Sequence, residues 1–277
     1  MPTFTSADGL SLHYEDHGTG LAVLCLAGLT RNSGDFEFLM PHLSHVRAIR
    51  MDYRGRGQSE YAEDFMTYSI VQEAEDAVAL LDHLGIERAV VIGTSRGGLI
   101  SMFLAALHPS RLRGVVLNDI GPDIAELGLT RIMEYLGREP QFPDLDAAGE
   151  ALHAVYAPDF PGVPVSRWRR QAELMWYEKP EGGLGLRYDA RLRDAMIAQA
   201  EAGPAPDLWP LFDQLAEVPL CALRGENSDL LTPATFERMQ AHAPDMHAVT
   251  IPDRAHVPFL DEPEAVAAIH ALLEHCK

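Results

Sequence analysis

Hydrophobic residues between positions 21 and 118 fall into two kinds of segment that alternate along the chain. Segments 21–26, 48–51, 89–93 and 112–117 are largely apolar throughout, as is typical of strands that are buried on both faces. Segments 67–84 and 96–107 instead show the spacing of a helix with one buried face. In the first of these, the apolar positions are Ile70, Val71, Ala74, Val78, Leu81 and Leu84. This alternation predicts a parallel sheet with helices on both faces.

The alternation is interrupted between residues 121 and 206, where helical segments, prolines and tryptophans occur but no convincing strand. It resumes with predicted helices at 208–216, 236–243 and 264–274 and predicted strands at 219–224 and 248–251. Two short strands are also expected near the start, at 3–5 and 10–15. We therefore expect an α/β core domain, residues 1–120 and 207–277, and a helical cap, residues 121–206. Ligands of such sheets bind outside the carboxyl ends of the strands, so a cap there would form a lid.

The segment between the third apolar run and the following helix contains the sequence G-T-S-R-G-G. A G-x-S-x-G sequence between a strand and a helix is typical of a nucleophile elbow, with Ser95 as the nucleophile. The glycines on either side allow the strand and the helix to approach closely. The start of the helix supplies backbone N–H groups and a positive dipole end, which would stabilise a negatively charged oxygen.

A serine hydroxyl needs a general base, and the base needs an acid that orients it. With this elbow the order along the chain is Ser, then Asp or Glu, then His. Of the 12 histidines, His256 follows the last predicted strand, so we predict that it is the base. The acid is predicted to be Asp229, in the loop after segment 219–224, which also contains Glu226. Asp119, at the end of segment 112–117, is the competing candidate.

An oxyanion hole in this arrangement needs two backbone N–H donors. The first is predicted to be the amide of Arg96, which follows the nucleophile directly. The second is expected in the loop after segment 21–26, which reads A-G-L-T-R-N, and Leu29 is our choice because Gly28 permits a tight approach. Arg31 lies in the same loop and is a candidate for binding substrate. Further candidates for the substrate pocket, all in the predicted cap, are Trp168, Trp176 and Tyr177.

These motifs resemble those of the α/β-hydrolase fold family, in particular its single-chain esterases with a helical cap, over nearly the whole chain. The matching segments are L-A-G-L at 26–29, D-Y-R-G-R-G-Q-S at 52–59, G-T-S-R-G-G at 93–98, N-S-D at 227–229 and A-H-V-P at 255–258. The resemblance implies an eight-stranded, mostly parallel sheet, the triad Ser95, Asp229 and His256, and oxyanion amides at Leu29 and Arg96. Two positions depart from the family pattern. Ala27 stands where many members have His, and Arg96 stands where an apolar residue or Gln is common.

The composition of the chain limits the kinds of molecule that we expect it to bind. The 277 residues have a formal net charge of −19, which argues against binding to nucleic acid or to anionic membrane surfaces. No run approaches the roughly 18 apolar residues that a membrane span requires, and the first residues do not have the pattern of a signal peptide. Three cysteines, two of them in predicted buried strands, indicate reduced thiols and a cytoplasmic protein. Metal and nucleotide motifs are missing, so we expect no metal and no cofactor.

The sequence therefore predicts a serine hydrolase that cleaves a carboxylic ester of a small, neutral or moderately apolar molecule. The same triad could instead hydrolyse a lactone or a C–C bond. A serine nucleophile argues against haloalkane dehalogenase and epoxide hydrolase activities, because those relatives use Asp at this position. A small-molecule receptor that retains the triad is the alternative outside catalysis. The sequence leaves the oligomeric state open.

Overall fold

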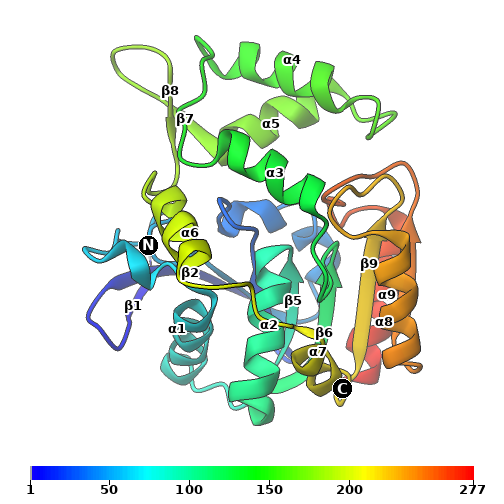
Figure 1. Ribbon diagram of the computed structural model, residues 1–277. Helices are drawn as coiled ribbons and strands as arrows, with labels where there is room; N and C mark the ends of the chain where they lie inside the picture. Colours follow the sequence, from blue (N-terminus) through cyan, green and yellow to red (C-terminus); the bar gives the residue numbers. More distant parts are fainter. Residues whose placement is uncertain (1) are drawn as a thin grey trace.

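A central eight-stranded sheet forms the base of the protein in the computed structural model, which describes residues 2–277 (Figure 1). The strands are β1 (Thr3–Thr5), β2 (Ser11–His17), β3 (Ala22–Leu26), β4 (Arg47–Met51), β5 (Ala89–Thr94), β6 (Leu112–Asn118), β9 (Leu220–Gly225) and β10 (His247–Ile251). Their order in space is β1-β2-β4-β3-β5-β6-β9-β10. β2 pairs antiparallel with β1 and β4, and all other neighbours are parallel. The predicted sheet is thus confirmed.

Helices cover both faces of this sheet, as the sequence predicts. One face carries α1 (Ile70–His83), α2 (Arg96–Leu107), α7 (Trp209–Leu215) and α8 (Pro233–His242). The other carries α9 (Pro263–His275) and the short 3-10 helices η1 (Ser33–Phe36) and η2 (Met40–Leu43). Two more 3-10 helices, η3 (Phe65–Thr67) and η4 (Pro109–Arg111), precede α1 and β6.

Alternating residues of the central strands supply the two halves of the core. In β3, Leu24 packs with the α1 and α2 side of the sheet, whereas its neighbour Cys25 packs with the α9 side. In β5, Val91 and Ile92 divide in the same way. This follows from the period of two in a strand, whose successive side chains point to opposite faces. An uninterrupted apolar run is therefore required wherever helices cover both faces.

Residues 121–206 lie over the carboxyl ends of the parallel strands, at the top of Figure 1. They contain the helices α3 (Glu126–Tyr135), α4 (Leu145–Tyr156), α5 (Val165–Met175) and α6 (Leu192–Glu201). They also contain a hairpin of β7 (Trp176–Glu178) and β8 (Leu184–Leu186), which the sequence did not predict. Each of these strands has only three residues, too few to produce a recognisable alternation. The segment has a small core of its own between α4, α5 and the hairpin.

Within residues 2–277 no helix combines the length and the apolar character that crossing a bilayer requires. All three cysteines, Cys25, Cys221 and Cys276, are free thiols in buried positions. Burial raises the pKa of both Cys25 and Cys221 to about 12.

Candidate active site

Ser95 lies on the sharp turn between β5 and α2. Its backbone has φ 49° and ψ −111°, a conformation that residues with a side chain rarely adopt. The turn is possible because Gly93 and Gly97, two residues before and two after Ser95, lack side chains. A Cβ atom on Gly97 would lie 2.0 Å from the carbonyl oxygen of Leu26, and one on Gly93 would lie 2.5 Å from the backbone of Gly97. The strained turn with its flanking glycines is the geometry that the G-T-S-R-G-G motif predicts.

Three side chains from three different loops meet at this turn. His256 Nε2 lies 3.1 Å from Ser95 Oγ, which is within hydrogen-bonding distance. The other ring nitrogen of His256, Nδ1, lies 2.7 Å from Oδ2 of Asp119. The sequence predicts that Ser95 and His256 lie together, and the structure places them in contact.

Asp119 follows β6 directly and takes a left-handed backbone conformation, with φ 56°. Its side chain is fully buried and accepts hydrogen bonds at both oxygens. Oδ1 accepts from the backbone N–H of Gly225 at 2.8 Å. Oδ2 accepts from Ser228 Oγ at 2.7 Å, in addition to its contact with His256. These donors fix the orientation of the carboxylate, so that Oδ2 faces Nδ1 of the imidazole.

The prediction that Asp229 contacts the histidine is wrong, because Asp119 occupies that position. Asp229 instead pairs with Arg131 of helix α3, with 2.5 Å between Nη1 and Oδ2. Both acids follow neighbouring strands, β6 and β9, whose carboxyl ends meet at the same point of the sheet. The loop after β9 presents Ser228 to this point, and the next residue turns toward the cap.

The two proposed oxyanion donors belong to the start of α2 and to the loop after β3. Arg96 is the first residue of α2, and the first amides of a helix have no partner within the helix. Leu29 lies on the loop after β3 and lines the cavity beside Ser95. Within residues 2–277 its amide has no hydrogen-bond partner. Neither amide is taken up by a hydrogen bond in the described residues, and their role as oxyanion donors stays a prediction.

A buried carboxylate, Glu73 of α1, connects Arg96 with the loop of Leu29 through two arginine contacts. It accepts a 2.5 Å hydrogen bond from Arg96 Nε and forms a 2.8 Å ion pair with Arg56 Nη1. Arg56 in turn donates through Nε to the carbonyl oxygen of Leu29 at 3.1 Å. The Arg96 side chain therefore braces the site from inside the protein and does not line the cavity. Sequence analysis did not single out Glu73.

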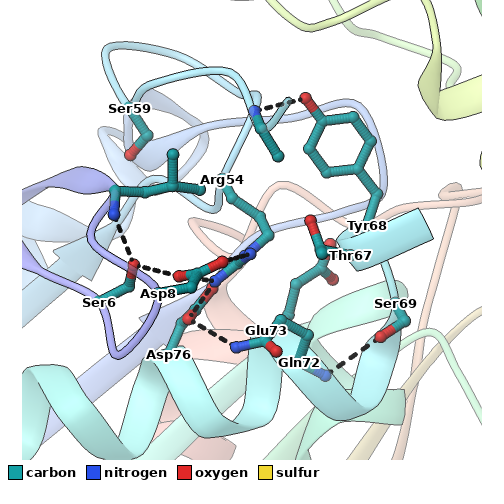
Figure 2. Close-up of polar contacts among 12 residues, drawn as sticks. Ser6, Asp8, Arg54, Ser59, Thr67, Tyr68, Ser69, Gln72, Glu73 and Asp76 are labelled. Carbon is teal, nitrogen blue, oxygen red and sulfur yellow. Dashed lines mark hydrogen bonds and ion pairs between the residues drawn. The ribbon is translucent and has the colours of Figure 1, made fainter. Parts of the chain in front are cut away.

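A second buried arginine anchors the same D-Y-R-G-R-G loop to α1 (Figure 2). Arg54 lies between Asp76 and Asp8 and donates to both carboxylates, at 2.6–2.7 Å and 2.8–3.1 Å respectively. These bonds lower the pKa of Asp8 to about 2. The loop that supports the oxyanion segment is thus tied to α1 at two separate points, by Arg54 and by Arg56.

A cavity of about 520 Å³ is lined by Ser95 and His256 and by side chains from residues 121–206. Of the residues that the sequence predicts to bind substrate, Arg31, Trp168 and Trp176 line this cavity. Tyr177 does not line it, which corrects the prediction for that residue. Trp176 and Tyr177 are successive residues of β7 and point to opposite sides of the hairpin, so the first is buried while the second is 43% exposed.

No group of three or more His, Cys, Asp or Glu side chains in residues 2–277 is arranged to hold a metal ion. The charged side chains near Ser95 are instead paired with one another, as in the Glu73 and Asp119 contacts.

Comparison with known proteins agrees with this geometry. The profile of the family described as "alpha/beta hydrolase fold" matches residues 22–263. The chain belongs to this family. Its sequence and its fold are similar to those of hydrolases over nearly their whole length.

Two curated relatives are hydrolases. The 3-hydroxybutyrate-oligomer hydrolase of Cupriavidus necator is 34% identical over 88% of this chain and 85% of its own. The 2-(acetamidomethylene)succinate hydrolase of Mesorhizobium japonicum is 30% identical over 89% of this chain and 85% of its own. The crystal structure of an α/β hydrolase from Novosphingobium aromaticivorans matches with a TM-score of 0.91 and 43% identity, over 99% of this chain and 97% of that one.

Proposed function

We propose that this hydrolase cleaves a carboxylic ester of a small molecule through an acyl-enzyme on Ser95. The observation that carries the proposal is the continuous contact from Ser95 Oγ to His256 and from His256 to Asp119, at 3.1 and 2.7 Å. A serine hydroxyl becomes a nucleophile when a positioned imidazole can accept its proton.

In the proposed reaction, Ser95 Oγ attacks the carbonyl carbon of the ester and His256 Nε2 takes the hydroxyl proton. Asp119 holds the imidazole in the tautomer that can accept this proton and stabilises the resulting cation. The amides of Leu29 and Arg96 stabilise the negative charge on the former carbonyl oxygen. His256 then donates its proton to the departing alkoxide. Water attacks the acyl-enzyme with the same histidine as base, which releases the acid and restores Ser95.

One of the relatives favours an ester over the other bonds that such a triad can cleave. The Cupriavidus relative is named for hydrolysing an oligomer of 3-hydroxybutyrate, and hydroxy acids form oligomers through ester bonds. The cavity is lined mainly by apolar and aromatic side chains, which suits a small and largely apolar molecule.

The proposal is tested by measuring hydrolysis of p-nitrophenyl esters, from acetate to long acyl chains, by wild type and by Ser95→Ala. We expect the substitution to reduce kcat by at least about 10³-fold while the circular dichroism spectrum stays unchanged. Wild-type activity in the purified variant would refute the mechanism. If the folded wild type hydrolyses none of these esters, the ester assignment fails, and lactones and C–C substrates should be tested with the same pair of proteins.

A further inference from the structure

One wall of the cavity carries polar groups that the proposed triad does not use. Arg31, two residues after the proposed oxyanion donor Leu29, forms a 2.6 Å ion pair with Asp35 and also donates to Oε1 of Gln171 in the cap. These contacts involve Nε and Nη2 of the guanidinium. Its remaining nitrogen, Nη1, has no partner within residues 2–277, although the side chain is only 17% exposed.

Three further polar groups on the same cavity wall lack a partner in the described chain. They are the amide nitrogen of Gln171, which is only 8% exposed, and the hydroxyls of Tyr135 and Tyr156. Burial raises the pKa of both tyrosines, so these hydroxyls are neutral donors. Tyr135 is 44% exposed, whereas Gln171 and the Arg31 side chain are only 8% and 17% exposed. Polar groups so far withdrawn from solvent are normally hydrogen-bonded, so the free nitrogens of Arg31 and Gln171 mark a place where a ligand supplies the acceptor. All four groups belong to residues that line the cavity, next to aromatic side chains such as Trp168 and Phe160 in the same lining.

The charge on this wall determines the kind of acceptor. The positive charge of Arg31 is balanced by Asp35, which lines the same cavity. A carboxylate on the ligand would lie near this second carboxylate, and the two negative charges would repel each other. An uncharged oxygen can accept from Nη1 without that repulsion. The wall therefore favours a hydroxyl or an ester carbonyl over a free acid.

The position of the wall indicates which part of the substrate it contacts. In the proposed reaction the alcohol part departs toward His256, because this residue gives the alkoxide its proton. Arg31 lies on the other loop, next to the proposed oxyanion donor Leu29. From this arrangement we infer that Arg31 and Gln171 bind an uncharged oxygen on the acyl part of the substrate, so that the preferred substrates are esters of hydroxyacyl or oligoester acids. This inference rests on the proposed function and names the substrate class of the same site.

The test compares ethyl 3-hydroxybutyrate, ethyl butyrate and monoethyl succinate, with hydrolysis followed by pH-stat. Each kcat/KM is divided by the rate of alkaline hydrolysis of the same ester, which removes differences in intrinsic reactivity. We expect wild type to prefer the hydroxy ester over the butyrate by about 10- to 100-fold, the effect of one hydrogen bond to a charged donor. Equal values for these two esters would overturn the inference. A preference for monoethyl succinate would overturn it as well, because it would show an anionic subsite.

A double variant, Arg31→Met with Asp35→Asn, removes the pair without leaving an unpaired buried charge. We expect it to bring the ratio of hydroxy ester to butyrate close to one. The matched control is Arg47→Met with Asp16→Asn, an ion pair of 2.7 Å on the sheet, which should leave the ratio unchanged. An unchanged ratio in the Arg31 variant would overturn the assignment of this residue.

Failure of the proposed function is distinguishable from failure of this inference. If no ester is turned over, the proposed reaction is wrong. If all three are hydrolysed at similar rates, only the acceptor site is wrong. Titration calorimetry of the intact esters with Ser95→Ala measures the same preference without turnover, and equal affinities there would refute the acceptor site independently.

Discussion

Replacing Asp119 by Asn tests whether Asp119 is the acid that orients His256. The substitution changes the charge and one hydrogen-bonding atom but scarcely changes the volume of the side chain. In the wild type, Oδ2 accepts from both Ser228 and His256, and Oδ1 accepts from the N–H of Gly225. An asparagine must place its NH₂ group at one of these two positions.

Either orientation of the asparagine amide disturbs the site, but the one with NH₂ at the Oδ2 position costs much less free energy. An NH₂ group at the Oδ1 position would face the fixed N–H of Gly225, leaving two buried donors against each other. At the Oδ2 position it would face Ser228, whose hydroxyl can rotate to accept, and His256 Nδ1. The imidazole would then have to accept at Nδ1 and carry its proton on Nε2, where it could not take the proton of Ser95. A base held in the wrong tautomer costs about 10³- to 10⁴-fold in kcat, or roughly 4–5.5 kcal/mol.

The assay is the steady-state hydrolysis of the best p-nitrophenyl ester by wild type, Asp119→Asn and Asp229→Asn. The last variant is the matched control, because it removes the same charge from the neighbouring loop. Its partner Arg131 is 56% exposed, so its loss should change kcat less than about threefold. The reasoning is refuted if Asp229→Asn loses as much activity as Asp119→Asn, or if Asp119→Asn keeps more than a tenth of wild-type activity.

Two further predictions follow from buried groups. Glu73→Gln should lower kcat by about 10-fold or more, because Arg96 and Arg56 lose the carboxylate that connects the two oxyanion positions. The equally buried Asp76→Asn, also on α1, should lower the melting temperature similarly but leave kcat near wild type; equal kcat losses would contradict this prediction. Cys25 should destabilise the fold above pH 9, because the unfolded thiol ionises near 9.0 while the folded thiol keeps its proton to about 12. Urea unfolding at pH 8 and pH 10 should show wild type losing about 1 kcal/mol more than Cys25→Ala, and equal losses would contradict the burial argument.

The sequence predicted the parts of the fold that depend on local pattern. A strand buried on both faces must be apolar at every position, and a turn that brings Gly97 against the β3 backbone must lack a side chain. These requirements are visible as residue types in a row. Ser95 and His256 could be predicted for a similar reason, because each can be identified from its position in the loop after a strand.

The acid could not be predicted with the same reliability, because the choice depends on contacts between loops. Asp119 and Asp229 both follow strands that end at the same edge, and both are acidic residues in polar loops. The difference arises from the turn after β9, in which the N–H of Ser228 donates to the carbonyl of Gly225. That turn directs Ser228 toward the histidine and the next residue toward Arg131, a cap residue nearly a hundred positions away.

Residues 121–206 likewise could be predicted only in part, because their arrangement depends on contacts between distant segments. The two tryptophans of residues 121–206 were expected at the pocket, and both line it. The β7–β8 hairpin, which directs Tyr177 outward, was not predicted. Its residues Trp176 and Leu184 pack against α4 and α5, and no pattern within three residues can reveal such contacts.

The balance of charge around the cavity has a consequence for the release of product. In the proposed reaction an uncharged ester enters and an acid, ionised at neutral pH, must leave. Asp35, Glu134 and Glu139 line the cavity together with Arg31 and Arg138, and the whole chain carries a formal charge of −19. Repulsion from this net negative charge raises the free energy of the bound anion but leaves that of the neutral ester almost unchanged. The same charges that weaken the binding of acids therefore limit product inhibition and favour departure of the acid into solvent.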